Sequence, residues 1–155
     1  DDHRGWMVIV DGRGRVRSGF RETGDRPGWH VLHWVSDGVP PEYLAFLRRE
    51  RIPYLVSKGR AVHLALASEK MRTKLGVKTL VTTAGGKLGG AFLRAGLVDE
   101  VNIILNPQLY LCLETPALFD SPDLRDDEWP TRLRLVTAQV YAAGNLWLRY
   151  EIARD

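Results

Sequence analysis

The feature that most constrains this chain is an alternation of helix-like and strand-like segments in its middle third. Four segments follow one another in the order helix, strand, helix, strand: 61–75, 77–83, 87–95 and 101–105. Gly76 and Gly96 stand where each helix should end. Such an alternation predicts an α/β fold with a mostly parallel sheet flanked by helices. The last strand is apolar enough to predict burial on both of its faces.

The remaining segments complete one predicted domain spanning residues 1–155. Shorter strands are predicted at 7–10, 31–35 and 54–57. A helix is predicted around Pro40-Pro41, with Ser36-Asp37 as its cap. Its inward face is the apolar stripe formed by Tyr43, Phe46 and Leu47. Alternating residues in 133–141 and 146–152, joined through a Gly-Asn turn, predict a C-terminal antiparallel hairpin. Residues 115–130 are rich in Pro and Asp and predict a surface loop.

The composition of the chain limits which classes of binding partner it requires. The 22 Lys and Arg against 19 Asp and Glu give a net charge of only +3, which does not require nucleic acid. No apolar run reaches the roughly 20 residues of a membrane span. Cys112 is the only cysteine and cannot form an internal disulfide, so we expect a buried thiol in a cytoplasmic protein.

The most informative segment runs from Thr82 to Gly90, where a strand ends in paired glycines and a helix begins. Bare backbone N–H groups at a helix N-terminus favour phosphate, and Lys87 would add a charge. The glycine spacing is neither GxGxxG nor a P-loop, because Val81 and Leu88 occupy P-loop positions. Phosphate binding and simple close packing therefore both remain open.

The chain also contains scattered histidines, a basic loop and several tryptophans. The histidines, at positions 3, 30, 33 and 63, are too scattered to predict a metal site. The arginines at 13, 15, 17, 21 and 26 form a basic loop, which is either solvated or a ligand for an adenosine 2′-phosphate. Without interleaved aromatic residues they do not indicate nucleic-acid binding. Trp29 and Trp34 either pack in the core, which is the favoured interpretation, or stack on a flat ligand. Residues 126–128 are expected to be an acidic surface loop.

The segment "LGVKTLVTTAGGKLGGAFLRAGLVDE" at 75–100 resembles the reductase domain of riboflavin biosynthesis. The similarity continues through Asn106-Pro107, "TPALF" at 115–119, "MVIVDGRGRV" at 7–16 and the C-terminal hairpin. The resemblance implies a dihydrofolate-reductase-like fold and NADPH-dependent reduction of a phosphoribosylamino-pyrimidine, whose ribose becomes a ribityl chain. It also implies a homodimer.

The resemblance assigns residues to the cofactor. Its phosphates would be held by Gly85, Gly86, Lys87, Leu88 and Gly89. Gly12 and Arg13 would lie near the cofactor at the Asp-Gly-Arg turn, and Asp1 matches an acidic residue near it.

Three departures from the family pattern favour a second hypothesis. The family's first strand, helix and loop have no counterpart here, so the N-terminal strand is expected to be missing. Ala84 replaces a Glu that would bind substrate, and bulkier residues at 108–113 replace a Gly-rich loop. The alternative is a catalytically silent paralogue that serves as a nucleotide-binding or assembly module. A dihydrofolate reductase proper is less favoured.

Overall fold

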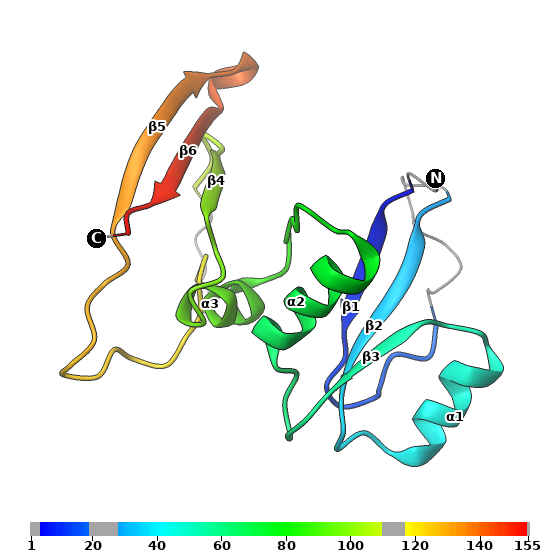
Figure 1. The fold of residues 1–155 in the computed structure, drawn as a ribbon. Coiled ribbons are helices and arrows are strands. Elements are labelled where there is room, and N and C mark those ends of the chain that lie inside the picture. The colour runs from blue at the N-terminus through cyan, green and yellow to red at the C-terminus, as the bar shows by residue number, and fades with distance from the viewer. Residues whose placement is uncertain (1–3, 19–27, 110–116, 155) are drawn as a thin grey trace. The chain divides into compact units, whose positions relative to one another are not determined.

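The computed structural model describes residues 4–18, 28–109 and 117–154. The chain divides into two compact units, residues 1–80 and 81–155. Each unit has a three-stranded sheet of its own (Figure 1). The sheet of the first unit is parallel, and that of the second unit is antiparallel.

The first unit is built on a parallel sheet in the order β1–β2–β3. Its strands are β1 (Trp6–Val10), β2 (His30–Ser36) and β3 (Tyr54–Ser57). Every residue of β1 pairs with β2, and every residue of β3 pairs with β2 on its other side. The three predicted strands are confirmed. Because the strands are parallel, their carboxyl ends lie at one edge of the sheet, where the turn after β1 begins.

Helix α1 (Pro41–Arg49) covers one face of β2. The apolar stripe predicted for it is confirmed, because Tyr43 and Leu47 are fully buried and form a core cluster with Val35. The predicted Ser-Asp cap is wrong: the helix begins later, and Pro40, with no side-chain hydrogen bond, is its N-cap.

Helix α2 (Leu64–Leu75) begins three residues later than predicted. The reason is His63, whose Nδ1 accepts the N–H of Leu66 at 3.3 Å and so caps the helix. The predicted end is confirmed, because Gly76 has the left-handed conformation with φ of 66°. Met71 and its neighbour one turn earlier are buried, which gives the helix its inward face.

The strand predicted at 77–83 is wrong. These residues form neither helix nor strand, and those from Lys78 onward are exposed. The N–H of Val77 bonds to the carbonyl oxygen of Met71, which extends the end of α2 instead. β-branched residues favour a strand only where a neighbour completes its hydrogen bonds. Within the described ranges this segment joins neither sheet, and the boundary between the units falls inside it.

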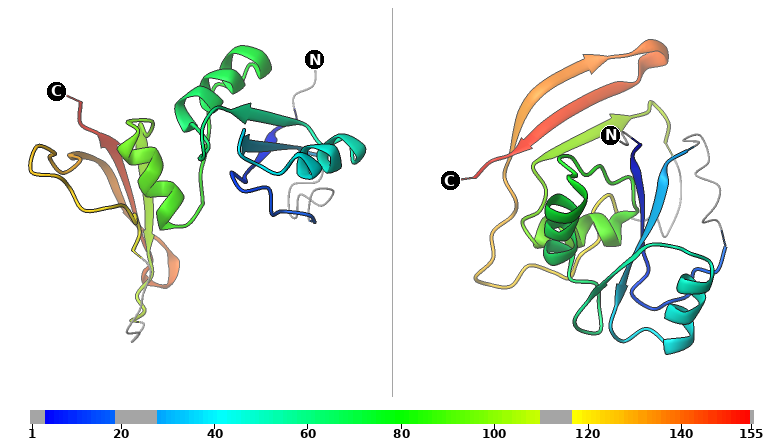
Figure 2. Two further views of the ribbon diagram at one scale, coloured as in Figure 1. Left: turned by 90° about the horizontal axis from the view of Figure 1, so that it is seen from below. Right: turned by 45° about the vertical axis from the view of Figure 1, so that its right-hand side comes forward.

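The second unit combines one helix with an antiparallel sheet in the order β4–β6–β5. Its elements are α3 (Gly86–Arg94), β4 (Glu100–Leu105), β5 (Leu133–Val140) and β6 (Leu146–Ile152). The predicted C-terminal hairpin is confirmed; a short 3₁₀ turn, Ala142–Gly144, joins its strands, which Figure 2 shows as a long curved ribbon. The predicted surface loop is confirmed for residues 117–130.

Strand β4 exists as predicted, but its predicted burial is wrong. Ile104 is 68% exposed and Leu105 57% exposed, and Val101 alone in the strand is buried. The strand pairs antiparallel with β6 and with no parallel neighbour in the described ranges. Apolar composition therefore identified the strand but not its surroundings. The α/β class is confirmed. Across the described residues, none of the helices has the length and apolar character needed to cross a bilayer.

Candidate functional site

The turn after β1 is organised by a buried carboxylate. Asp11 is only 6% exposed, and its Oδ2 accepts the N–H of Val16 at 2.7 Å. The N–H groups of Arg13 and Arg15 also bond to this carboxylate. Three backbone donors thus converge on one side chain, which fixes the conformation of residues 11–16, hereafter the Asp11 turn.

Tyr43 of α1 and His33 of β2 contact this turn from the interior, and both are fully buried. The Tyr43 hydroxyl lies 3.1 Å from the carbonyl oxygen of Val16 and also bonds to the Asp11 carboxylate. His33 Nδ1 lies 3.1 Å from the same hydroxyl. Because the hydroxyl gives its single proton to an oxygen, His33 Nδ1 is the donor in this contact. Together they form the Asp11–Tyr43–His33 network.

The surroundings shift the pKa of each member. Burial acts to raise the pKa of Asp11, but hydrogen bonds from Val16, Tyr43 and the two arginine N–H groups outweigh it and lower the pKa. Burial lowers the pKa of His33, and the Asp11 charge opposes this only in part. Burial, together with the Asp11 carboxylate, raises the pKa of Tyr43 far above its usual value. The network is thus a neutral imidazole, a neutral phenol and a carboxylate at neutral pH.

Two glycines let the turn lie close to the interior. Gly14 has φ of 65°, and a Cβ there would lie 2.8 Å from Cδ1 of Tyr43. The carbonyl oxygen of Gly12, a predicted cofactor residue, accepts a hydrogen bond from Ser36 Oγ at 2.7 Å. A Cβ at Gly12 would lie 3.4 Å from Val62 Cγ2. The backbone of Gly12 is therefore fixed from the inside.

The arginines of this region divide into two groups. The Arg17 guanidinium carbon lies 4.7 Å from the ring centroid of Tyr43 and 5.1 Å from that of Phe46, so Arg17 is held over the aromatic side chains of α1. Arg13 and Arg15 are exposed, and Arg17 is exposed as well. Arg13, predicted to lie near the cofactor, thus presents its charge at the surface of the first unit.

In the second unit, the predicted glycine turn opens α3. Gly85 is its N-cap, in extended conformation, and a Cβ there would meet nothing within 4 Å. Lys87 in the first turn is exposed, as is Ala84 before the cap. The N–H of Leu88 is bonded to the Gly85 carbonyl oxygen at 3.1 Å. An open backbone and a nearby cation at a helix N-terminus suit a phosphate group.

The other glycines of α3 form a packing face. Gly86, Gly89 and Gly90 recur at helical spacing and lie on one side of the helix. A Cβ on Gly86 would lie 2.4 Å from the carbonyl oxygen of Ala117, and one on Gly90 would lie 2.4 Å from that of Asp120. The N–H of Asp120 bonds to the Gly86 carbonyl oxygen at 3.0 Å. Close packing of a loop therefore requires these glycines, whereas Gly85 is free of that constraint.

Arg94, the last residue of α3, fixes the same loop. Its guanidinium bonds to Glu128 at 2.7 Å and 3.0 Å, to Ser121 Oγ at 2.9 Å and to the Pro122 carbonyl oxygen at 2.5 Å. The N–H of Arg125, followed by the Arg94 side chain, lowers the pKa of Glu128. Glu128 had been predicted to lie on a merely acidic surface loop, and no sequence signal linked it to Arg94.

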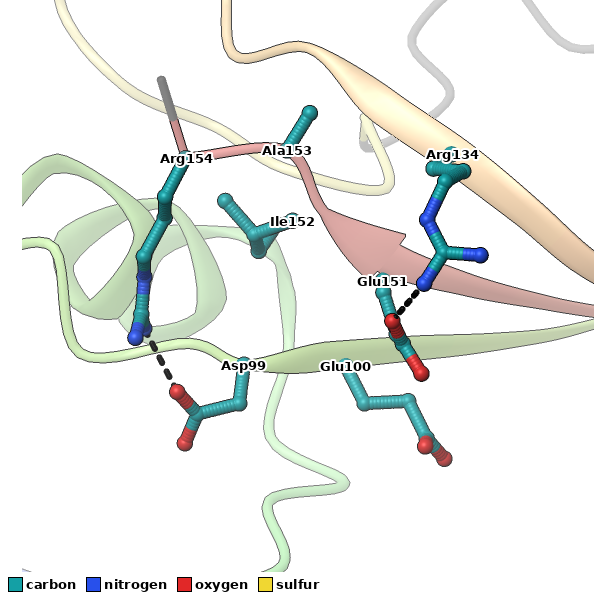
Figure 3. Close-up of a pocket in the computed structure, with 7 residues that line it drawn as sticks. All are labelled: Asp99, Glu100, Arg134, Glu151, Ile152, Ala153 and Arg154. Carbon is teal, nitrogen blue, oxygen red and sulfur yellow. Dashed lines mark hydrogen bonds and ion pairs between the residues drawn. The ribbon is translucent and has the colours of Figure 1, made fainter.

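A concavity of about 570 Å³ lies elsewhere in the second unit, beside the start of β4 and the end of β6 (Figure 3). Its charged lining residues are paired with one another or with a neighbour: Asp99 with Arg154, Glu151 with Arg134, and Glu100 with Arg149. None of the predicted site residues lines it. Because its charges are already neutralised, this concavity is a poor candidate for an anionic ligand.

Several predictions lie outside the described residues: those for Asp1, His3, Arg21, Arg26 and Cys112. Of the remaining histidines, His30 has its ring tilted by 34° against that of Trp6, with the ring centroids 4.8 Å apart, while His33 and His63 have the roles given above. Over the described ranges, groups of three possible metal ligands are absent. Trp34 is buried, as predicted, whereas Trp29, also expected in the core, is only partly buried. Sequence reasoning missed the Asp11–Tyr43–His33 network, although the Asp before Gly12 marked the turn.

A parallel sheet with helices, followed by a strand and an antiparallel hairpin, defines an α/β domain of the dihydrofolate-reductase-like type. The chain belongs to the RibD C-terminal domain family, whose model matches residues 4–147. No curated protein matches the chain significantly.

Solved structures share the fold at low identity. A pyrimidine reductase-like protein from Corynebacterium diphtheriae is 20% identical, with a TM-score of 0.76 over 96% of this chain and 61% of its own. RibD from Acinetobacter baumannii is 21% identical, with a TM-score of 0.69 over 94% of this chain and 37% of its own. A deaminase/5-amino-6-(5-phosphoribosylamino)uracil reductase from Thermotoga maritima is 16% identical, with a TM-score of 0.59 over 96% and 38%. The chain thus spans less than two thirds of these proteins.

Proposed function

We propose that this chain is an NADPH-dependent reductase domain of the riboflavin-pathway type. The observation that carries the proposal is the match of the family model over residues 4–147. The substrate would be a phosphoribosylamino-pyrimidine, such as the 5-amino-6-(5-phosphoribosylamino)uracil named for the Thermotoga protein. Its ribosyl group would be reduced to a ribityl chain by gain of a hydride and a proton.

The residues present fit a pyridine nucleotide. In the second unit, Gly85 offers a backbone that no side chain crowds, and Lys87 offers an exposed cation. In the first unit, Arg13 and Arg15 offer exposed guanidinium groups beside the fixed backbone of Gly12. When bound, NADPH would supply the hydride, and these residues would bind and orient its phosphate groups.

Nucleotide titration followed by turnover tests this proposal. The intact protein should bind NADPH in a calorimetric titration and should oxidise it only when the phosphoribosylamino-pyrimidine is present. The same titration with NADH measures the preference for the 2′-phosphate. A protein that binds neither nucleotide at millimolar concentration would contradict the proposal.

A second candidate is a silent paralogue that retains nucleotide binding or serves in assembly. It is favoured by Ala84, which is exposed next to the Gly85 cap and lacks the hydrogen-bonding carboxylate of the family's Glu. Reinstating the carboxylate with Ala84→Glu distinguishes the two candidates. A reductase with altered substrate preference should change its relative rates, whereas a silent paralogue should turn over nothing in either form, whether or not it binds NADPH.

The expected partners follow from the same proposal. A small pyrimidine substrate and a second copy of the chain are proposed, without nucleic acid or membrane. A mass measurement in solution tests the homodimer, which should have twice the 17.5 kDa of one chain. The single Cys112 is in keeping with a cytoplasmic location.

A further inference from the structure

The Asp11 turn uses its backbone donors internally. The N–H groups of Arg13, Arg15 and Val16 bond to the Asp11 carboxylate, and the N–H of Gly14 bonds to the Asp11 carbonyl oxygen at 3.2 Å. Turns of this kind bind phosphate through converging N–H groups when those groups are open. Here a carboxylate of the chain itself already lies where such an anion would bind. A phosphate at this turn must therefore be bound by side chains.

Two side chains of the turn meet that requirement. Arg13 and Arg15 are exposed, and a guanidinium group forms paired, charge-assisted hydrogen bonds with phosphate oxygens. Arg17 is exposed as well, but its guanidinium group already lies over the rings of Tyr43 and Phe46. The turn thus separates its charges, with the carboxylate inside and two cations outside.

The network maintains this separation. Tyr43 and His33 are fully buried and engage the carboxylate side of the turn, so the Asp11 side chain is retained in the interior. If Asp11 turned outward, its negative charge would pair with a neighbouring arginine and repel a phosphate. Retaining Asp11 inside therefore keeps the arginines available.

We propose that Asp11, retained by Tyr43 and His33, is a positioning residue that makes Arg13 and Arg15 the phosphate ligands of the first unit. The inference rests on the proposed function in so far as the phosphate is that of the pyridine nucleotide. The chemistry is shared by its 2′-phosphate and its pyrophosphate, and the experiment separates the two.

The test uses the full chain and four variants: Asp11→Asn, Arg13→Ala/Arg15→Ala, their triple combination, and Arg49→Ala. Arg49→Ala is the control, because it removes an exposed arginine at the C-terminal end of α1. Calorimetry measures the affinity of each protein for NADPH, NADH and inorganic pyrophosphate. Amide exchange without ligand measures the protection of residues 13–16, and circular dichroism checks folding.

The expected pattern is specific to positioning. Asp11→Asn should lower the exchange protection of residues 13–16 and weaken NADPH binding about tenfold, whereas the arginine pair should weaken binding without loss of protection. In the background without Arg13 and Arg15, Asp11→Asn should have no further effect on affinity. Loss confined to NADPH identifies the 2′-phosphate, and loss for both nucleotides identifies the pyrophosphate.

Two results would overturn the inference. One is equal weakening by Asp11→Asn with and without the arginines, which is the behaviour of a merely structural residue. The other is an effect of Arg49→Ala as large as that of the arginine pair. If the wild type binds neither nucleotide, the proposed function fails. The inference then stands only if pyrophosphate binding still depends on Arg13, Arg15 and Asp11, and is overturned otherwise.

Discussion

At the scale of single residues, His33 makes the stability of the first unit depend on pH. Its pKa in the folded protein lies below the ordinary 6.5, because the ring is buried. Below pH 6.5 the unfolded chain therefore binds more protons than the folded one, and stability is lost as the pH falls through this value towards the folded pKa. Asp11 stays ionised through this window, because its pKa is lowered.

The expected result is a free energy of unfolding that falls between about pH 7 and about pH 5.5, by at most about 1.4 kcal/mol per pH unit. Urea titrations that follow tryptophan fluorescence, to which the buried Trp34 contributes, measure it. His33→Gln should flatten the dependence, and His30→Gln, in the same strand, should not. A wild-type stability that is constant over this range would contradict the role given to His33.

Gly14 allows backbone strain and side-chain crowding to be separated. Gly14 and Gly76 have nearly the same φ, 65° and 66°, but a Cβ would clash with Tyr43 only at Gly14. Both alanine variants should lose about 1 kcal/mol from the left-handed conformation, and Gly14→Ala should lose a further 1–3 kcal/mol or so from overpacking. Equal losses in denaturant titrations would show that the Tyr43 ring yields.

Sequence reasoning located parts of the candidate site but not its organisation. The Asp-Gly-Arg turn was identified, because its residues are adjacent in the chain. In the sequence alone, Tyr43 belongs to an apolar helix stripe and His33 is one of four scattered histidines, because 32 and 22 residues, respectively, separate them from Asp11. Only the pairing of β1 with β2 and the packing of α1 bring the three together.

At the scale of elements, the glycine face of α3 reverses the usual effect of replacing a helix glycine by alanine. Alanine normally stabilises a helix by up to about 1 kcal/mol relative to glycine. Gly90→Ala should instead destabilise the second unit, because its Cβ would lie 2.4 Å from a backbone oxygen of Asp120. Ala91→Gly, on the exposed face of the same helix, should lose about 0.5–1 kcal/mol from propensity alone.

Thermal unfolding followed by far-ultraviolet circular dichroism compares the two variants. A Gly90→Ala protein as stable as the wild type would mean that the loop after residue 116 moves away at little cost. The packing constraint at Gly86 is of the same kind, so we expect Gly86→Ala to destabilise the second unit as well.

The elements that sequence predicted correctly are those whose signal is local. Strands β1, β2 and β3 are short apolar runs bounded by turns, and the hairpin of β5 and β6 carries its own turn residues. The two wrong predictions, a strand at 77–83 and burial of β4, both depend on which other segments lie beside the strand. A run of β-branched residues favours a strand, but the neighbouring strand that it must pair with comes from another part of the chain.

At the scale of the whole molecule, charge predicts where the salt dependence of binding originates. The net charge of +3 on 155 residues is too small for strong long-range attraction, and at physiological salt exposed charges are screened beyond about 8 Å. Any salt dependence of NADPH affinity should therefore come from cations that touch its phosphates, which we propose to be Arg13 and Arg15 in the first unit. Calorimetric titrations between about 0.05 M and about 0.3 M salt should show weaker binding at higher salt. Replacing both arginines by alanine should reduce that slope, and Arg49→Ala should leave it nearly unchanged. An unchanged slope without the two arginines would assign the phosphate to other cations, of which Lys87 beside the open Gly85 backbone is the first to substitute.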